Sequence, residues 1–88
     1  MNPVFTFGFK LAELTKQSEA ASIGLVSLAI KDAGKNAQQM GYQDFKTVFQ
    51  DHLPKRLEKL NIPDREKIIG QMLQYLGQQQ SLLTMTAA

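Results

Sequence analysis

His52 is the single histidine of this 88-residue chain, and histidine is the residue type that most often carries acid–base chemistry near neutral pH. It has no thiol to activate because the chain contains no cysteine, and no serine lies in the same helical segment. Asp44 and Asp51 are close to it in sequence, but one imidazole with two separated carboxylates makes a weak metal site. We therefore expect His52 to be a surface or helix-packing residue, and we predict no metal ion and no other cofactor.

The remaining polar residues also lack the spacing that catalysis requires. No two carboxylates form a close pair within an apolar stretch, the pattern that separates the pKa values of a general acid and a general base. The six glycines do not cluster into a phosphate-binding loop, and the serines match no nucleophile motif. We predict that the chain is not an enzyme and has no small-molecule substrate.

Charged side chains are confined to two stretches of the sequence, positions 10–19 and 31–67, and the formal net charge is only +2. Elsewhere the polar surface must come from uncharged residues, and glutamine is the most frequent of these. Uncharged polar faces lose less solvation than Lys and Glu faces when they are buried against another protein. The pattern favours a protein partner over a polyanion, and Gln71, Gln74 and Gln78 in the uncharged C-terminal stretch are candidate partner-binding residues.

Three phenylalanines near the N-terminus, Phe5, Phe7 and Phe9, alternate with non-aromatic residues, which is the period-2 pattern of a half-buried strand. No second stretch of the chain alternates in this way, so a strand here would have no partner strand. We therefore predict an extended aromatic arm over residues 1–9, which forms a short strand only if it pairs with its own copy in a dimer. Its rings are candidate anchors, either for packing onto the helices or for a partner, including a second copy of the chain.

The clearest helical pattern places apolar residues at strict spacings of three and four on one face. Gly24 within this helix suggests close approach of a second helix, and Gly41 is placed as the left-handed residue that would end it. The apolar face is a candidate self-association seam or core seam, formed by Ile23, Val26, Ile30, Ala33, Ala37 and Met40.

Two further helical regions follow. Residues 42–61 contain Pro54, which either kinks one helix or separates two. Their inward positions are Phe45, Val48, Phe49, Leu53, Leu57 and Leu60. The last helix begins after the Asn61–Asp64 turn, and we expect residues 84–88 to be frayed. Its apolar stripe is predicted to be Ile69, Met72, Leu73, Leu76 and Leu83.

The segment Ala37-Gln38-Gln39-Met40-Gly41 resembles part of a helix-turn-helix signature, in which an alanine four residues before the turn glycine lets two helices pack closely. The resemblance implies a DNA-binding regulator as the alternative function. Downstream the sequence departs from the pattern, since Thr47 and Gln50 occupy positions where buried aliphatic residues are expected. The residues that would contact nucleic acid are Gln43, Lys46, Lys55, Arg56, Lys59, Arg65 and Lys67.

Together these patterns predict an all-α protein: a single domain over residues 1–88 that forms a small bundle of about four helices, preceded by the aromatic arm. We expect a non-catalytic protein–protein interaction module, such as an adaptor, a regulatory inhibitor or an assembly factor. Self-association as a homo-oligomer, most simply a dimer, would complete the small core of a chain that has no disulfide bonds to stabilise it. With no export signal and no bilayer-spanning run, we expect a cytoplasmic protein. Peripheral membrane binding through the aromatic arm is a third, minor alternative.

Overall fold

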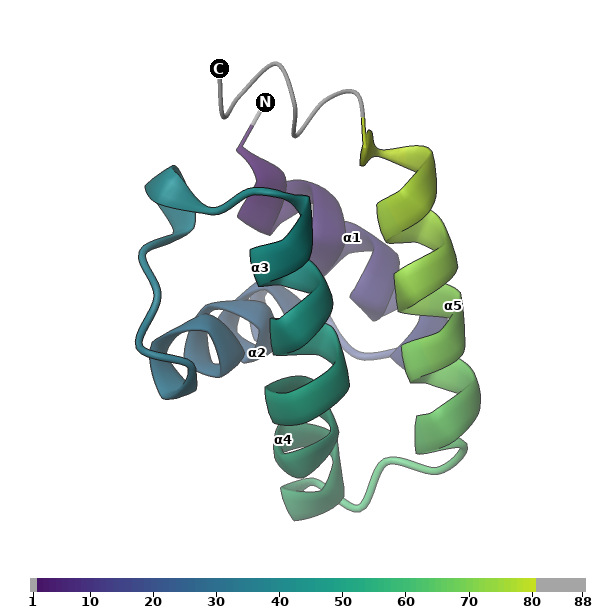
Figure 1. The fold of residues 1–88 in the computed structure, drawn as a ribbon. Helices are drawn as coiled ribbons and strands as arrows, with labels where there is room; N and C mark the ends of the chain where they lie inside the picture. The colour runs from purple at the N-terminus through teal and green to yellow at the C-terminus, as the bar shows by residue number, and fades with distance from the viewer. Residues whose placement is uncertain (1, 81–88) are drawn as a thin grey trace.

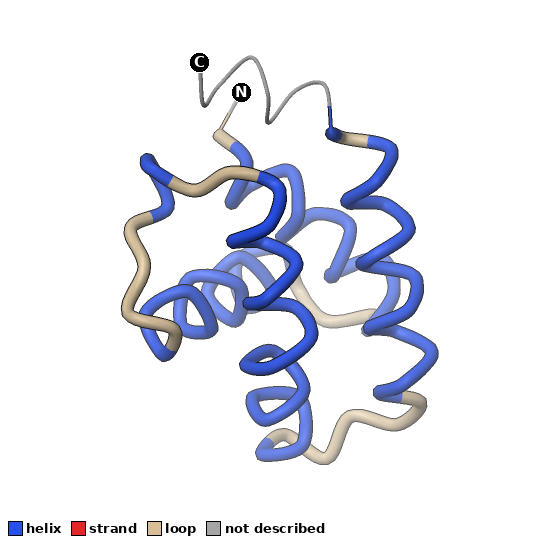
Figure 2. The backbone as a smooth tube through the Cα atoms, in the orientation of Figure 1, coloured by secondary structure: helices blue, strands red, loops and turns tan. Residues whose placement is uncertain are grey.

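The computed structural model describes residues 2–80, and every regular element in this range is helical (Figure 1; Figure 2). The α-helices are α1 (Pro3–Thr15), α2 (Glu19–Asp32), α3 (Tyr42–Thr47), α4 (Leu53–Lys59) and α5 (Arg65–Gln78). A 3₁₀ turn, η1 (Ala37–Gln39), precedes α3, and a π-helical turn, η2 (Val48–His52), joins α3 to α4 without a break. The prediction of an all-α bundle of about four helical segments is therefore confirmed.

The predicted extended arm is wrong, because residues 3–15 form α1. The side-chain Oδ1 of Asn2 accepts a hydrogen bond from the Val4 N–H at 2.9 Å, and Pro3 occupies the first turn, where its missing N–H costs nothing. Helical geometry places Phe7 on the buried face and Phe5 and Phe9 on the outer face. The Asn-Pro pair at the start was the sequence signal for this helix.

Phe7 holds the bundle together at its centre. Its ring is fully buried, and its centroid lies 4.9 Å from that of Phe45, 5.2 Å from that of Phe49 and 6.0 Å from that of Tyr75. These partners come from α3, η2 and α5, so one ring of α1 joins three other segments of the chain. Figure 1 shows the same arrangement, with α1 and α2 behind the α3–α4 segment and α5.

The close approach between helices lies at Gly8, and the expectation for Gly24 is wrong. A Cβ atom placed on Gly8 would lie 2.5 Å from Cγ1 and 2.8 Å from Cα of Ile23, whereas nothing lies within 4 Å of a Cβ placed on Gly24. α1 and α2 therefore cross at a distance that only glycine permits at position 8. The Ser18 hydroxyl begins α2 by accepting from the Ala21 N–H at 3.1 Å.

The central helix is shorter than the apolar spacing predicts. α2 ends at Asp32, Gly34 adopts a left-handed conformation with φ +68°, and the Asn36 side chain caps η1 by accepting from the Gln38 N–H at 3.0 Å. Gly41 is not a left-handed end residue, since its φ is −104° and it begins α3, where its N–H donates to Asp44 Oδ2 at 3.0 Å. Local turn residues thus interrupt a pattern that continues in the core. Val26, Ile30 and Met40 of the predicted seam are buried in this chain's own core, and Ile23, Ala33 and Ala37 pack against it.

Pro54 neither ends the helix nor simply kinks it. A proline has no N–H for the carbonyl four residues earlier, and its ring clashes with that carbonyl in a regular α-helix. The π turn η2 ends two residues before it, and the Leu53 N–H bonds to the Val48 carbonyl five residues back, so the wider turn carries the helix past the proline. Most of the predicted inward positions are confirmed by burial, but Leu60, just beyond the end of α4, is 54% exposed.

The buried stripe of α5 starts one residue earlier than predicted. Ile68, Met72 and Leu76 are buried, while Ile69 and Leu73 pack at the edge of the core. Spacings of four from position 68 keep these three side chains on one face. The predicted stripe residue Leu83 and the expected frayed end at 84–88 lie outside the described residues.

Candidate interaction surface

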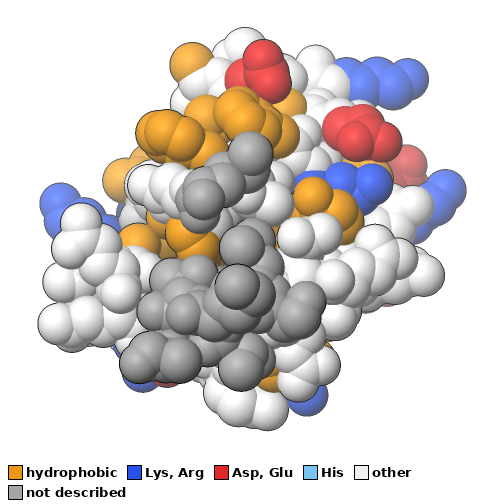
Figure 3. Space-filling model, turned by 90° about the horizontal axis from the view of Figure 1, so that it is seen from above, with side chains coloured by type: hydrophobic (Ala, Val, Ile, Leu, Met, Phe, Trp, Pro, Cys, Tyr) orange, Lys and Arg blue, Asp and Glu red, His pale blue; other side chains and the backbone are white. Residues whose placement is uncertain are grey.

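Phe5 and Phe9 form an exposed aromatic pair on α1. The two residues are one helical turn apart, their ring centroids are separated by 6.4 Å, and their exposed fractions are 46% and 42%. Figure 3 views the molecule from the end at which α1 begins, and hydrophobic side chains gather on that face. Of the three predicted aromatic anchors, two are accessible to a partner and the third, Phe7, belongs to the core.

The three predicted glutamines lie along one side of α5 and line a shallow hollow of about 140 Å³ between α5 and α1. Lys10 and Leu14 of α1 form the opposite wall. The Lys10 ammonium lies 5.3 Å from the Tyr75 ring centroid and 3.6 Å from Glu13 Oε1, so it bridges the two helices over an aromatic face. Sequence patterns identified the glutamines but not the α1 wall, because only the packing of α1 against α5 brings it there.

A second hollow, of about 320 Å³, continues this one toward the start of α5, and Leu14 and Gln71 line both. Two cationic side chains, Lys16 and Lys67, line the second hollow together with Asp64. The backbone of Lys16 and that of Asp64 are left-handed, with φ of 61° and 58°. We call the two hollows together the α1–α5 groove. It combines a basic end with a glutamine-lined end.

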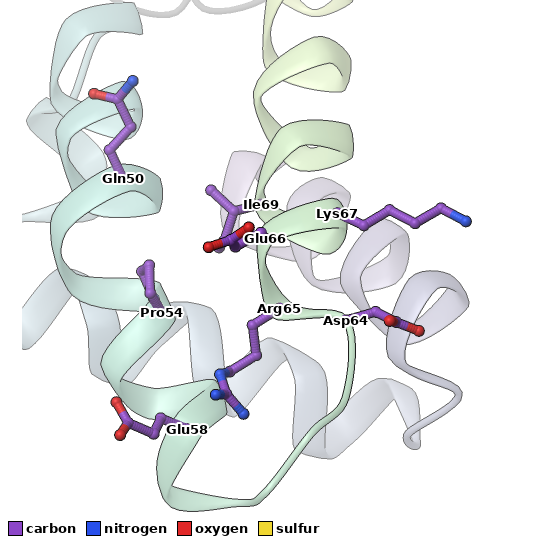
Figure 4. A pocket seen from close by; sticks show the side chains of 8 residues that line it. All are labelled: Gln50, Pro54, Glu58, Asp64, Arg65, Glu66, Lys67 and Ile69. Carbon is purple, nitrogen blue, oxygen red and sulfur yellow. The ribbon is translucent and has the colours of Figure 1, made fainter.

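A third hollow, of about 800 Å³, lies on the other side of α5, against the α4 side of the bundle (Figure 4). Glu58 lines one wall and Arg65 and Glu66 line the other. Arg65 Nη1 donates to the Ile62 carbonyl at 3.1 Å, and Lys67 points away from the hollow in Figure 4. This cleft therefore holds charges of both signs, and one of them is already committed to the chain's own backbone.

The residues of the nucleic-acid alternative are spread over α3, α4 and the start of α5. Arg56 makes a bidentate contact with Asp32, in which its Nε and Nη2 each donate to a carboxylate oxygen at 2.7 Å. The hydrogen bond from Arg56 lowers the pKa of the Asp32 carboxyl, and the same contact raises the pKa of the Arg56 guanidinium. Arg56 therefore ties α4 to the end of α2. Residues 33–41 separate α2 from α3, so Ala37 and Gly41 do not flank a tight turn between two helices.

The remaining candidate for chemistry, His52, is half-buried at the end of η2. Asp44, near it in sequence, is occupied elsewhere: the Gly41 N–H and then Lys35, 3.2 Å away, lower the pKa of its carboxyl. Within residues 2–80, no three histidine or carboxylate side chains come together in a group that could hold a metal ion. No helix in the same range has both the length and the apolar character needed to cross a membrane.

Comparison with protein-family models, with curated proteins and with solved structures gives no significant match for this chain. The chain's own surface must therefore supply the functional argument. Its two distinctive features are the exposed Phe5–Phe9 pair and the α1–α5 groove, and both involve α1.

Proposed function

We propose that this chain is a non-catalytic protein–protein interaction module that self-associates through the outer face of α1. The observation that carries the proposal is the Phe5–Phe9 pair, because each of the two residues exposes more than 40% of its surface and their rings lie beside each other. Adjacent exposed aromatic rings supply much of the binding energy where they are buried at the centre of an interface. The groups with shifted pKa, Asp32, Asp44 and Arg56, are engaged in contacts within the fold, which fits a binding role.

A second copy suits the Phe5–Phe9 pair because residues 2–9 carry no charged side chain, and the nearest charge on the same face is Glu13, one turn beyond Phe9. In a two-fold contact each residue meets the same patch on the other copy, so an uncharged patch brings no like charges together. Offset or tilted stacking of Phe5 and Phe9 across the axis would add to the burial of apolar area.

The size of the patch predicts weak association. A buried phenylalanine removes about 150–250 Å² from water, so covering the exposed parts of the two rings on both copies buries about 350 Å². Stable interfaces bury about 1,200–2,000 Å² in total. We therefore expect a concentration-dependent dimer with a dissociation constant between about 10 µM and 1 mM.

Sedimentation velocity between about 10 µM and 1 mM protein tests the proposal. The wild-type sedimentation coefficient should rise with concentration, and the Phe5→Ser/Phe9→Ser variant should remain monomeric. Leu60→Ser is the matched control, since Leu60 is 54% exposed at the far end of α4 and should leave association unchanged. A wild-type monomer at the highest concentration, or equal loss in the control, would refute self-association through this face.

A further inference from the structure

The basic end of the α1–α5 groove lies beside the start of α5. Lys16 and Lys67 line it, and neither forms an ion pair with any residue in the described range 2–80. Among the described residues that line the groove, Asp64 has the single acidic side chain. Lys10 adds a third cation at the glutamine-lined end, where the exposed Glu13 partly offsets its charge. An occupant with carboxylates would therefore complement the groove.

The glutamine-lined end of the groove presents side-chain amide groups. Gln71, Gln74 and Gln78 line it, and their side-chain amides make no hydrogen bond to other residues of the range 2–80. A glutamine amide both donates and accepts, so it can pair with the N–H and C=O groups of an extended backbone. Such pairing favours an occupant with an extended backbone and depends little on the types of its side chains.

The dimensions of the groove suit a short extended segment. From Lys67 to Gln78 the helix rises about 16 Å at 1.5 Å per residue. An extended chain covers that distance in about five residues at roughly 3.3 Å each. Leu14 lies where the two hollows meet and gives an apolar contact midway along this path.

We propose that the α1–α5 groove binds an extended acidic segment of about five residues from a partner protein. Its carboxylates lie against Lys16 and Lys67, and its backbone pairs with the glutamines. This inference rests on the chain being an interaction module, but it uses a surface distinct from the Phe5–Phe9 pair. Binding of the segment and self-association can therefore be tested separately.

The test is fluorescence anisotropy with a labelled Asp-Leu-Glu-Leu-Asp peptide as the probe and a Lys-Leu-Lys-Leu-Lys peptide as the charge-reversed comparison. We expect the acidic probe to bind with a dissociation constant of about 0.1–1 mM and the basic peptide at least tenfold more weakly. Lys16→Gln/Lys67→Gln should weaken the acidic probe about fivefold, since exposed charge pairs contribute modestly. Gln74→Glu should weaken it as well by placing a carboxylate in its path.

Lys31→Gln/Lys55→Gln is the matched control, because it removes two exposed lysines of α2 and α4 and changes the net charge equally. Equal weakening in this control, equal binding of both peptides, or no binding of the acidic probe at millimolar concentration would overturn the inference. The Phe5→Ser/Phe9→Ser variant should bind the probe as the wild type does. If the wild-type protein self-associates but does not bind the acidic probe, only the groove proposal is refuted. If it binds the probe but stays monomeric, only the aromatic interface is refuted.

Discussion

Replacing Gly8 by alanine tests the central packing contact of the fold. In an exposed helix interior this change stabilises a protein by about 1 kcal/mol, because alanine has the higher helix propensity. At position 8 the new Cβ would lie 2.8 Å from the Cα of Ile23. That atom belongs to the backbone of α2, so no side-chain rotation can relieve the contact.

The packing cost should exceed the propensity gain. Carbon atoms in favourable contact are about 3.5–4.0 Å apart, so α1 and α2 must separate by roughly 0.7 Å or more. Overpacking of this kind costs about 1–3 kcal/mol, to which the separation of Phe7 and Leu11 from their neighbours adds. We expect Gly8→Ala to lower the free energy of unfolding by about 1–2 kcal/mol, which corresponds to a loss of roughly 4–16 °C in Tm for a domain of this size.

Gly24→Ala is the matched control, because it makes the same change in α2 with no atom within 4 Å of the new Cβ. It should raise the free energy of unfolding by about 1 kcal/mol. Urea unfolding followed by circular dichroism measures both variants, with an unchanged m-value as the condition for comparing midpoints. If Gly8→Ala is as stable as Gly24→Ala, the close crossing of α1 and α2 at this residue is refuted.

Two further outcomes follow from buried and paired polar groups. The Ser22 hydroxyl is buried with no hydrogen-bond partner within residues 2–80, so Ser22→Ala should raise the free energy of unfolding by about 1–2 kcal/mol; a lower urea midpoint would contradict this. The depressed pKa of Asp32 stabilises the fold above the unfolded-state value of about 3.9, and this contribution is lost as pH falls through the folded-state pKa. Urea midpoints measured from pH 7 to pH 3 should therefore fall less in Asp32→Asn than in the wild type, and parallel curves would exclude this role.

The end of the central helix was predicted wrongly both by the apolar spacing and by Gly41, which begins α3 instead of ending the helix before it. The spacing through Ala37 and Met40 extends the central helix, but Gly34 and Asn36 interrupt it by supplying a left-handed residue and a local cap. Near the N-terminus, the alternation of phenylalanines suggested an extended arm, and the prediction did not use Asn2 and Pro3, which form the N-cap and first turn of α1. A cap satisfies backbone groups directly, whereas alternation over five residues is compatible with either structure.

The candidate site was predicted in part. Gln71, Gln74 and Gln78 share one side of α5 through their spacing, and the structure places them in a single groove. Lys10, Leu14 and Lys16 could not be assigned to the same groove from the sequence, because nothing local records which face of α1 meets α5. The distinction between Phe7 and its two neighbours likewise required the packing of α1.

By itself, the sequence determined the helical class, most of the inward positions in residues 42–61 and the uncharged character of both the aromatic and the glutamine-rich stretches. These properties follow from residue type and short-range spacing, which act within one or two helical turns. Only the tertiary structure decided that Gly8 permits the crossing of α1 and α2, that a π turn carries the helix past Pro54, and that a basic groove forms between α1 and α5. The crossing and the groove depend on contacts between segments far apart in the chain, and steric fit between those segments is not encoded in the pattern of either one alone. The π turn is local, but the sequence pattern left open whether Pro54 kinks one helix or separates two.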